Sequence, residues 1–285
     1  MIDSGRVAII YNSRISDAYS LAVTIANQLG LSYESSVFPA YREKEINFAD
    51  NISLIITIGG DGTILWAAQL AAPMRIPILG INMGAVGFMA ELSPSDAVGR
   101  MDEYLNGETW LEKRTMITAR VELEDASSKE SDTYNCLNEV VVGRGNISRP
   151  IHLETYVDNT LTSVHRSDAI IVATATGSTG YSLSAGGPIL QPQSTDIIIN
   201  PVAPHLGLAS ALVVPDLSTI RVKNTGEQTA YISVDGRYSI ELQSESSVVI
   251  NKSDMDTMFL RSGIDDYFYS SLLQRLRAGL ASRQG

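Results

Sequence analysis

The sequence predicts two domains of different class: an α/β N-terminal domain with a parallel sheet, and an all-β C-terminal domain followed by a C-terminal helix. The chain has 285 residues, which exceeds one typical domain. Strand-like and helix-like segments alternate over residues 1–108, as in a parallel sheet covered on both faces. Short strands with polar turns fill residues 109–262, and residues 263–285 have helical periodicity.

The expected elements of the first domain follow in order. Residues 7–11 form a short apolar strand, and a helix begins near Asp17, with Ser16 as its N-cap and Gly30 as its stop. The apolar run 53–58 predicts a buried strand, and residues 64–72 predict a helix that ends before Pro73. A strand over 76–81 and a helix over 95–106, ended by Gly107, complete the alternation.

The second domain is predicted from period-two alternation of apolar and polar residues. Strands are expected at 120–124, 156–158, 169–173, 219–223, 231–235 and 239–242. The charged stretch 125–132 is interpreted as a solvated hairpin loop. Near the C-terminus, leucines recur at helical spacing, so this helix buries a stripe, and we expect it to pack back on the α/β domain.

Composition and charge exclude several classes of partner. The 32 acidic and 21 basic residues give a net charge of −11, which argues against nucleic acid or an anionic membrane surface. No apolar run is long enough to cross a bilayer, and the N-terminus lacks the features of a signal peptide, so we expect a cytoplasmic protein. Cys136 is the only cysteine, and the three histidines lie far apart in sequence, so no protein-made metal site is expected.

The segment Gly59-Gly60-Asp61-Gly62-Thr63 joins an expected strand to an expected helix. Glycines at such a joint let a polyanion approach the backbone, so that N–H groups and the helix N-terminus face phosphate oxygens. A carboxylate in an anion site is unfavourable unless it binds Mg²⁺ or accepts a proton from an attacking hydroxyl. The alternative is that Asp61 only forms a turn with an Asx hydrogen bond.

A second glycine-rich and hydroxyl-rich segment, 176–188, follows the strand 169–173. Small residues allow a flat ligand to approach, hydroxyls donate and accept hydrogen bonds, and Tyr181 offers a ring face or an O–H group. Arg166 and Asp168 precede this segment, and Asn138-Glu139 stands at the head of another apolar strand. Neither glycine segment fits the G-x-G-x-x-G or the G-x-x-x-x-G-K-[ST] pattern, which excludes a Rossmann dehydrogenase and a P-loop protein.

Taken together, these segments and Pro204-His205 resemble the NAD kinase family in order and interval over most of the chain. The first glycine segment is shared with diacylglycerol, sphingosine and phosphofructokinase-like kinases, whereas Ser-Thr-x-Tyr-Ser-Leu-Ser-Ala-Gly-Gly-Pro is specific to the family. The resemblance implies a site in the cleft between an α/β domain and a β-sandwich-like domain. It also implies ATP- and Mg²⁺-dependent phosphorylation of the adenosine 2′-hydroxyl of NAD. Homodimers or homotetramers, in which a neighbouring subunit can complete the dinucleotide site, are a further implication.

The resemblance also assigns roles to individual residues. Asp61 is the proton acceptor, and Gly60 and Gly62 approach the ligand. The dinucleotide site is lined by Asn138, Glu139, Arg149, Arg166, Asp168, Thr179, Gly180, Tyr181, Ser182, Leu183, Ser184 and Arg237. Three departures from the family pattern, Trp66, Gly180 and Ser210, concern contacts to the phosphate donor more than contacts to NAD.

Two other functions stay open at this point. A lipid or sugar kinase of the same superfamily would share Asp61 but would not need the pocket at 179–184. A non-catalytic dinucleotide sensor would bind NAD or NADP without consuming ATP.

Overall fold

The computed structural model describes residues 6–41, 46, 48, 52–84, 87–122, 132–145, 149–263, 268–270, 272 and 273, and the structural statements below concern these residues. They fall into two compact units, one formed by 1–113 with 257–285 and the other by 114–256. The domain boundaries expected at residues 108 and 262 remain predictions.

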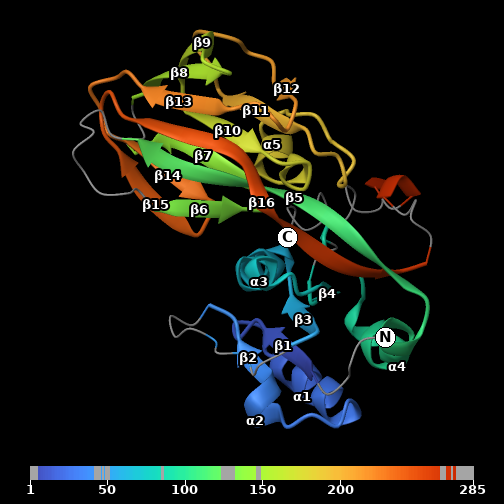
Figure 1. Ribbon diagram of the computed structural model, residues 1–285. Coiled ribbons are helices and arrows are strands. Elements are labelled where there is room, and N and C mark those ends of the chain that lie inside the picture. The colour runs from blue at the N-terminus through green and yellow to red at the C-terminus, as the bar shows by residue number, and fades with distance from the viewer. Residues whose placement is uncertain are drawn as a thin grey trace. The chain divides into compact units, whose positions relative to one another are not determined.

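The first unit contains a parallel sheet with helices on both faces (Figure 1). Its strands β1 (Val7–Tyr11), β2 (Val37–Pro39), β3 (Leu54–Gly59) and β4 (Ile78–Asn82) are ordered β2-β1-β3-β4, with parallel neighbours. Its helices are α1 (Ala18–Gln28), α2 (Tyr33–Ser36), α3 (Asp61–Met74) and α4 (Pro94–Asn106). This arrangement confirms the predicted α/β class.

The two faces of this sheet are covered by different helices. Side chains of α1 and α4 share one apolar cluster with Ile56 and Leu79. Helix α3 lies on the other face, because Ile64 approaches Gly80, and neighbouring residues of a strand point to opposite faces. Strand β3 is buried along its whole length, as expected for a strand inside a two-sided parallel sheet.

The second unit is an antiparallel β-sandwich. One sheet has the order β12-β11-β10-β7-β14-β15, and the other contains β16-β13-β8-β9 together with β5 and β6. The bounds are β5 (Thr109–Glu122), β6 (Thr133–Cys136), β7 (Glu139–Arg144), β8 (Ile151–Val157), β9 (Thr160–Ser167), β10 (Ala169–Ala173), β11 (Ile197–Val202), β12 (Leu212–Val214), β13 (Ile220–Asn224), β14 (Ala230–Val234), β15 (Tyr238–Leu242) and β16 (Ser247–Ser262).

The core of this unit lies between its two sheets. Val140 and Val172 of one sheet share a fully buried apolar cluster with Leu153 and Val222 of the other. Side chains alternate between this core and the surface along strands such as β13, which produces the period-two pattern seen in the sequence. The sandwich-like prediction is therefore confirmed. A short 3₁₀ helix (Gly177–Thr179) and α5 (Tyr181–Ser184) follow β10.

Several predicted limits of elements were wrong. Helix α1 has Asp17, and not Ser16, at its N-cap position. Helix α3 begins at Asp61 and contains Pro73 in its last turn. The fixed φ of proline is compatible with a helix, but Pro73 has no backbone N–H and cannot donate a hydrogen bond there. The helix ends at its C-cap residue Arg75, which has a φ of +54°. Strand β14 ends at Val234 because Asp235 takes a positive φ.

Two other predictions fall partly outside the described residues. Residues 268–270, 272 and 273 are helical, as expected for the C-terminal helix, whereas 264–267, 271 and 274–285 lie outside the described residues. The predicted loop 125–132 is described only at Asp132, and strand β5 is described up to Glu122.

Candidate functional site

The glycine segment lies at the junction of β3 and α3 in the first unit. Gly59 is the last residue of β3, Gly60 is the N-cap of α3 with an extended backbone, and Asp61 is the first helical residue. A Cβ atom placed on Gly59 would lie 2.3 Å from Oγ1 of Thr63, so this position requires glycine. Asp61 therefore stands at a helix N-terminus, where the helix dipole favours negative charge.

The Asp61 carboxylate is held by a second segment that follows β4. Its Oδ2 accepts a hydrogen bond from the backbone N–H of Phe88 at 3.0 Å, and its Oδ1 accepts one from the N–H of Met89 at 3.4 Å. A Cβ atom placed on Gly87 would lie 2.2 Å from Oδ1, so the segment passes directly over the carboxylate. An Asx turn would instead bond the backbone just after Asp61. The carboxylate is thus oriented by a segment far away in sequence.

A buried carboxylate organises the second candidate site, in the β-sandwich unit. Asp235 accepts hydrogen bonds from the backbone N–H groups of Leu137 (2.9 Å), Asn138 (2.8 Å) and Glu139 (3.2 Å), and from the Cys136 thiol (2.9 Å). Burial raises the pKa of the Cys136 thiol well above its ordinary value, so the thiol stays protonated and donates. Asp235 thereby fixes the turn that presents Asn138 and Glu139.

Asn138 and Glu139 each carry a buried oxygen whose hydrogen-bonding capacity is unused. Within the described part of the chain, Oδ1 of Asn138 and Oε2 of Glu139 have no hydrogen-bond partner. Unpaired buried polar atoms are costly, so such atoms favour a site that a polar ligand completes. A Cβ atom placed on Gly180 would lie 2.9 Å from Oε2 of Glu139 and 3.5 Å from Nδ2 of Asn138. The three predicted residues are therefore neighbours.

The protonation of Glu139 is set by its surroundings. Burial and, secondly, the negative charge of Asp235 raise its pKa from 4.5 to about 7, and the backbone N–H of Tyr181 partly offsets this shift. Near neutral pH the side chain therefore exists both as a hydrogen-bond donor and as an acceptor.

The segment after β10 is tied to the same turn by backbone contacts. Thr174 donates from Oγ1 to the Leu137 carbonyl at 2.5 Å and from its N–H to the Asn138 carbonyl at 2.9 Å. A Cβ atom placed on Gly177 would lie 2.1 Å from the Asn138 carbonyl oxygen, so only glycine fits this crossing. These contacts bring the two predicted segments together.

The members of the 179–184 segment differ in their exposure. Tyr181 is 44% exposed, and Thr179, Gly180 and Leu183 are half-buried, while Ser184 is exposed. The Thr179 hydroxyl donates to the Thr176 carbonyl at 3.1 Å. Ser182 is fully buried, and its carbonyl and hydroxyl oxygens accept hydrogen bonds from Asn200. Ser182 thus supports the segment from inside the protein.

Arg166 and Asp168 lie at and just beyond the end of β9, and their environments differ. Asp168 forms an ion pair with Arg144 of β7, with Oδ2 and Nη2 3.0 Å apart. Arg166 has an exposed side chain, and its carbonyl accepts a hydrogen bond from the N–H of His205 at 2.7 Å. His205, quoted in the sequence pattern, is therefore placed beside Arg166 by backbone pairing.

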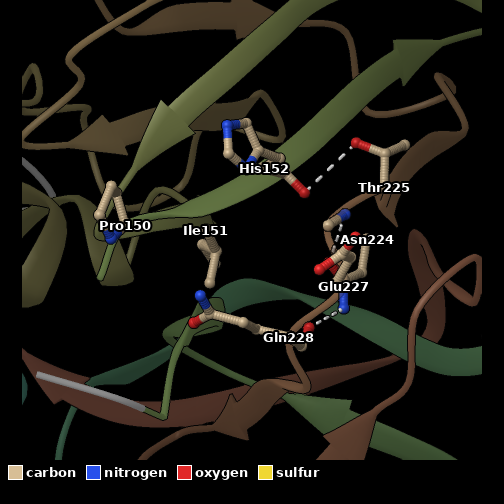
Figure 2. Close-up of a pocket in the computed structure, with 8 residues that line it drawn as sticks. Pro150, Ile151, His152, Asn224, Thr225, Glu227 and Gln228 are labelled. Carbon is tan, nitrogen blue, oxygen red and sulfur yellow. Dashed lines mark hydrogen bonds between the residues drawn. The ribbon is translucent and has the colours of Figure 1, made fainter. Parts of the chain in front are cut away.

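The remaining predicted cations lie elsewhere on the second unit. Arg237 lies in the hairpin turn after Asp235, with its guanidinium 5.5 Å from the Tyr238 ring centre. Arg149 lines a cavity of about 360 Å³ together with Gly145, Gln228, Thr229 and Tyr231. A neighbouring pocket has a volume of about 320 Å³. Residues 150–152 and 224–228 line it (Figure 2). None of the predicted site residues lines the pocket of Figure 2.

Several residues that shape these sites were not identified from the sequence. Gly87, Phe88 and Met89 act on Asp61 through a contact that local patterns do not contain. Asp235 was interpreted as a strand residue, although Asp-Gly after an alternating strand is typical of a type I′ hairpin turn. Both Asp235 and Gly236 have positive φ, at +48° and +67°.

Metal-binding clusters and membrane-spanning helices are absent from the described residues. No group of three or more His, Cys, Asp or Glu side chains in the described ranges is arranged to hold a metal ion. Among the helices that the structure describes, none has the length and apolar character needed to cross a membrane.

Comparison with known proteins gives consistent results over most of the chain. Residues 31–109 match the family model of the ATP-NAD kinase N-terminal domain, and residues 137–262 match that of the ATP-NAD kinase C-terminal domain. An NAD kinase of Dehalococcoides mccartyi is 37% identical over 95% of this chain and 96% of its own length. An NAD kinase of Chloroflexus aggregans is 33% identical over 95% of this chain and 98% of its own length.

Solved structures agree with these matches. An NAD kinase from Archaeoglobus fulgidus in complex with ATP superposes with a TM-score of 0.74 at 26% identity, covering 96% of this chain and 99% of that one. A yeast NADH kinase complexed with NADH has the same fold, with a TM-score of 0.75 at 21% identity, covering 94% of this chain and 87% of that one.

Proposed function

This chain belongs to the ATP-NAD kinase family, and from that premise we propose that it transfers the γ-phosphoryl group of ATP to the adenosine 2′-hydroxyl of NAD, giving NADP and ADP. It is a phosphotransferase with an alcohol group as acceptor. The observation that carries the phosphoryl-transfer step of this proposal is the Asp61 carboxylate, oriented at the N-terminus of α3 by the N–H groups of Phe88 and Met89.

In this proposal Asp61 accepts the proton of the attacking hydroxyl. The oxygen of that hydroxyl forms a bond to the γ-phosphorus as the bond to the leaving ADP oxygen breaks, and the transition state is loose. Bond formation acidifies the hydroxyl, so a carboxylate can take its proton late in the step. The fixed orientation of the carboxylate supports this role because general-base catalysis depends on position as well as on basicity.

We propose that Mg²⁺ reaches the protein bound to the phosphates of ATP. Mg²⁺ commonly keeps several waters and is held by one or two carboxylates plus substrate phosphates. The carboxylate that Asp61 offers at the glycine segment fits this mode. When bound, the ion neutralises phosphate charge that this acidic chain could not balance alone.

The dinucleotide is assigned to the residues around the Asn138-Glu139 turn. The unpaired oxygens of Asn138 and Glu139 support binding of a ligand with hydroxyl or amide donors. Gly180 leaves room beside them, and the exposed ring of Tyr181 can stack on a base or nicotinamide. We also keep Arg149, Arg166, Asp168, Thr179, Ser182, Leu183, Ser184 and Arg237 as proposed contributors to this site.

Assays with matched substrates distinguish the candidate functions. The purified protein is incubated with ATP, Mg²⁺ and NAD, and NADP is measured with a dehydrogenase that accepts only NADP; parallel reactions contain diacylglycerol or a sugar. NADP formation supports the proposal. Phosphorylation of the lipid or sugar alone would assign a related kinase, and tight NAD binding without consumption of ATP would assign a sensor. Replacing ATP with other triphosphates or polyphosphate, and NAD with NADH, defines the substrate range.

We further propose a cytoplasmic homodimer or homotetramer. Large apolar side chains are exposed next to Arg166, where Leu206 is 62% exposed and its N–H bonds the Arg166 carbonyl, and where Leu208 is 43% exposed. A second copy covering these side chains would lie beside a proposed NAD contact. Light scattering tests the assembly, and a fully active monomer would contradict a site completed across subunits.

The proposed cytoplasmic location is compatible with Cys136, which is a free, buried thiol, as expected in a reducing compartment.

A further inference from the structure

The segment that orients Asp61 is itself held from its other side by Arg261. Arg261 belongs to β16, and it is one of the largest fully buried side chains, at 1% exposure. Its Nη1 donates a hydrogen bond to the Met89 carbonyl at 3.0 Å. Both backbone polar groups of Met89 are therefore hydrogen-bonded, because its N–H donates to Oδ1 of Asp61 and its carbonyl accepts from Arg261.

Two carboxylates fix the guanidinium of Arg261 in this position. Nε lies 2.7 Å from Oε2 of Glu112, and Nη1 lies 3.0 Å from Oε2 of Glu91. The planar fork of a guanidinium can serve several acceptors in fixed directions, which an ammonium group cannot reproduce. Glu91 is held in turn by the Tyr104 hydroxyl at 3.0 Å and by the Ser262 N–H at 3.3 Å. The Met89 carbonyl thus accepts a hydrogen bond from a guanidinium group that Glu91 and Glu112 hold in place.

We propose that Arg261 is a positioning residue for phosphoryl transfer, acting through Met89 on Asp61. The inference rests on the proposed function, in which Asp61 accepts the proton. Its physical basis is that a displacement of about 1 Å caused by a mutation remote from the chemistry can reduce the rate about a hundredfold. Arg261 is linked to Asp61 through the two backbone hydrogen bonds of Met89, so its proposed effect is on the geometry of the carboxylate.

Steady-state kinetics on Arg261→Lys and Arg261→Gln test the catalytic consequence. We expect kcat to fall about tenfold to a hundredfold in Arg261→Gln, with a smaller loss in Arg261→Lys and with the KM values for NAD and ATP within about threefold of the original. Two controls separate this from general destabilisation. Met101→Ala removes a fully buried side chain of α4, and Arg100→Gln breaks an exposed pair with Glu103 at the edge of the same network.

The controls show whether a loss of kcat in the Arg261 variants comes from misplacement of Asp61 or from general destabilisation of the protein. Met101→Ala should lower the melting temperature and leave kcat almost unchanged, and Arg100→Gln should change neither quantity much. A fall of kcat in Met101→Ala equal to that in Arg261→Gln, at equal loss of stability, would reduce Arg261 to a structural residue and overturn the proposal.

Hydrogen exchange provides a readout that does not need kinase activity. In both Arg261 variants the amides of Phe88 and Met89 should exchange at least about tenfold faster, while the amide of Asn82, which bonds the Leu92 carbonyl, should be unaffected. Unchanged exchange of these amides in an active, folded variant with normal kcat would overturn the inference alone. Absence of NADP formation by the original protein would overturn the proposed function, and exchange would still decide whether Arg261 holds the segment.

Discussion

Gly87 leaves the space that the Asp61 carboxylate occupies: a Cβ atom at residue 87 would lie 2.2 Å from Oδ1 of Asp61 and 2.7 Å from its Cγ. The carboxylate can therefore meet the N–H groups of Phe88 and Met89 only because residue 87 has no side chain. This contact joins the segment that follows β4 to the start of α3, and both α3 and β4 lie between these two places in the sequence.

Gly87→Ala should move the Asp61 side chain away from these amides. A methyl group this close must displace something, and the carboxylate at the end of its side chain moves more easily than the backbone. We expect turnover to fall about tenfold to a hundredfold, since misplacement of a catalytic group by about 1 Å has effects of that size. A coupled assay for NADP measures the loss. Gly84→Ala is the matched control, because a Cβ there meets nothing within 4 Å, and equal losses in both variants would contradict the steric explanation.

Asp61→Asn tests the proposed base directly. The amide keeps the shape of the side chain, but it has one acceptor oxygen, so one of the two N–H groups of Phe88 and Met89 loses its partner. That loss should cost about 1–3 kcal/mol of unfolding free energy, which leaves the protein folded at room temperature. Removing the proton acceptor should lower turnover at least about a hundredfold, while calorimetry should still detect NAD binding. Near-normal turnover in a folded Asp61→Asn protein would restore Asp61 to a purely structural role.

The local parts of the fold and site could be predicted from the sequence. Alternating strand and helix patterns predicted the parallel sheet, in which burial on both faces makes β3 mostly apolar, with Thr57 as its polar residue. Asp61 could be identified as a candidate because a carboxylate repels phosphate, so its presence in a glycine-rich phosphate site indicates a chemical role. The limits of α3 were harder to predict, since tertiary packing extends the helix through Pro73 despite the poor helix propensity of proline.

The contacts that orient the site could not be predicted, because they join segments far apart in sequence. Nothing near Gly87 indicates that its backbone passes over Asp61, and Arg261 is only one of four charged residues in β16. Asp235 was predicted as a strand residue, although an Asp-Gly pair after an alternating strand is typical of a hairpin turn, and both Asp235 and Gly236 have positive φ. Its hydrogen bonds to the 137–139 turn, however, require the paired strands β7 and β14 to be known.

Asp235→Asn should weaken the turn that carries Asn138 and Glu139. The carboxylate accepts four hydrogen bonds, and an amide would place an NH₂ group against the N–H of Leu137 or against the other donors. One unsatisfied buried donor costs about 1–3 kcal/mol, so the unfolding free energy should fall by that amount in urea titrations. Asp102→Asn, at an exposed position of α4, is the control and should change stability little. A fully stable Asp235→Asn protein would show that the turn does not depend on this carboxylate.

Glu139 should make the stability of the protein depend on pH in a defined direction. Its pKa is raised from 4.5 to about 7, chiefly by burial and then by Asp235. Below about pH 4.5 the carboxyl is protonated in both the folded and the unfolded chain and costs nothing. Between these two values the unfolded chain loses its proton first, so the free energy of unfolding falls as pH rises, and above about pH 7 the whole penalty is present.

Glu139→Gln removes that titration and keeps the shape of the side chain. Relative to the original protein, the variant should gain up to about 3 kcal/mol of unfolding free energy between about pH 5 and pH 8, since each unit of pKa shift corresponds to about 1.4 kcal/mol. Urea titrations of both proteins at several pH values measure this difference. Glu241→Gln, at an exposed position of β15, is the control and should show no pH-dependent gain of that size. A constant difference between the original protein and Glu139→Gln across this range would mean that Glu139 is ionised throughout, which would contradict the raised pKa and leave this side chain only as a hydrogen-bond acceptor for the dinucleotide.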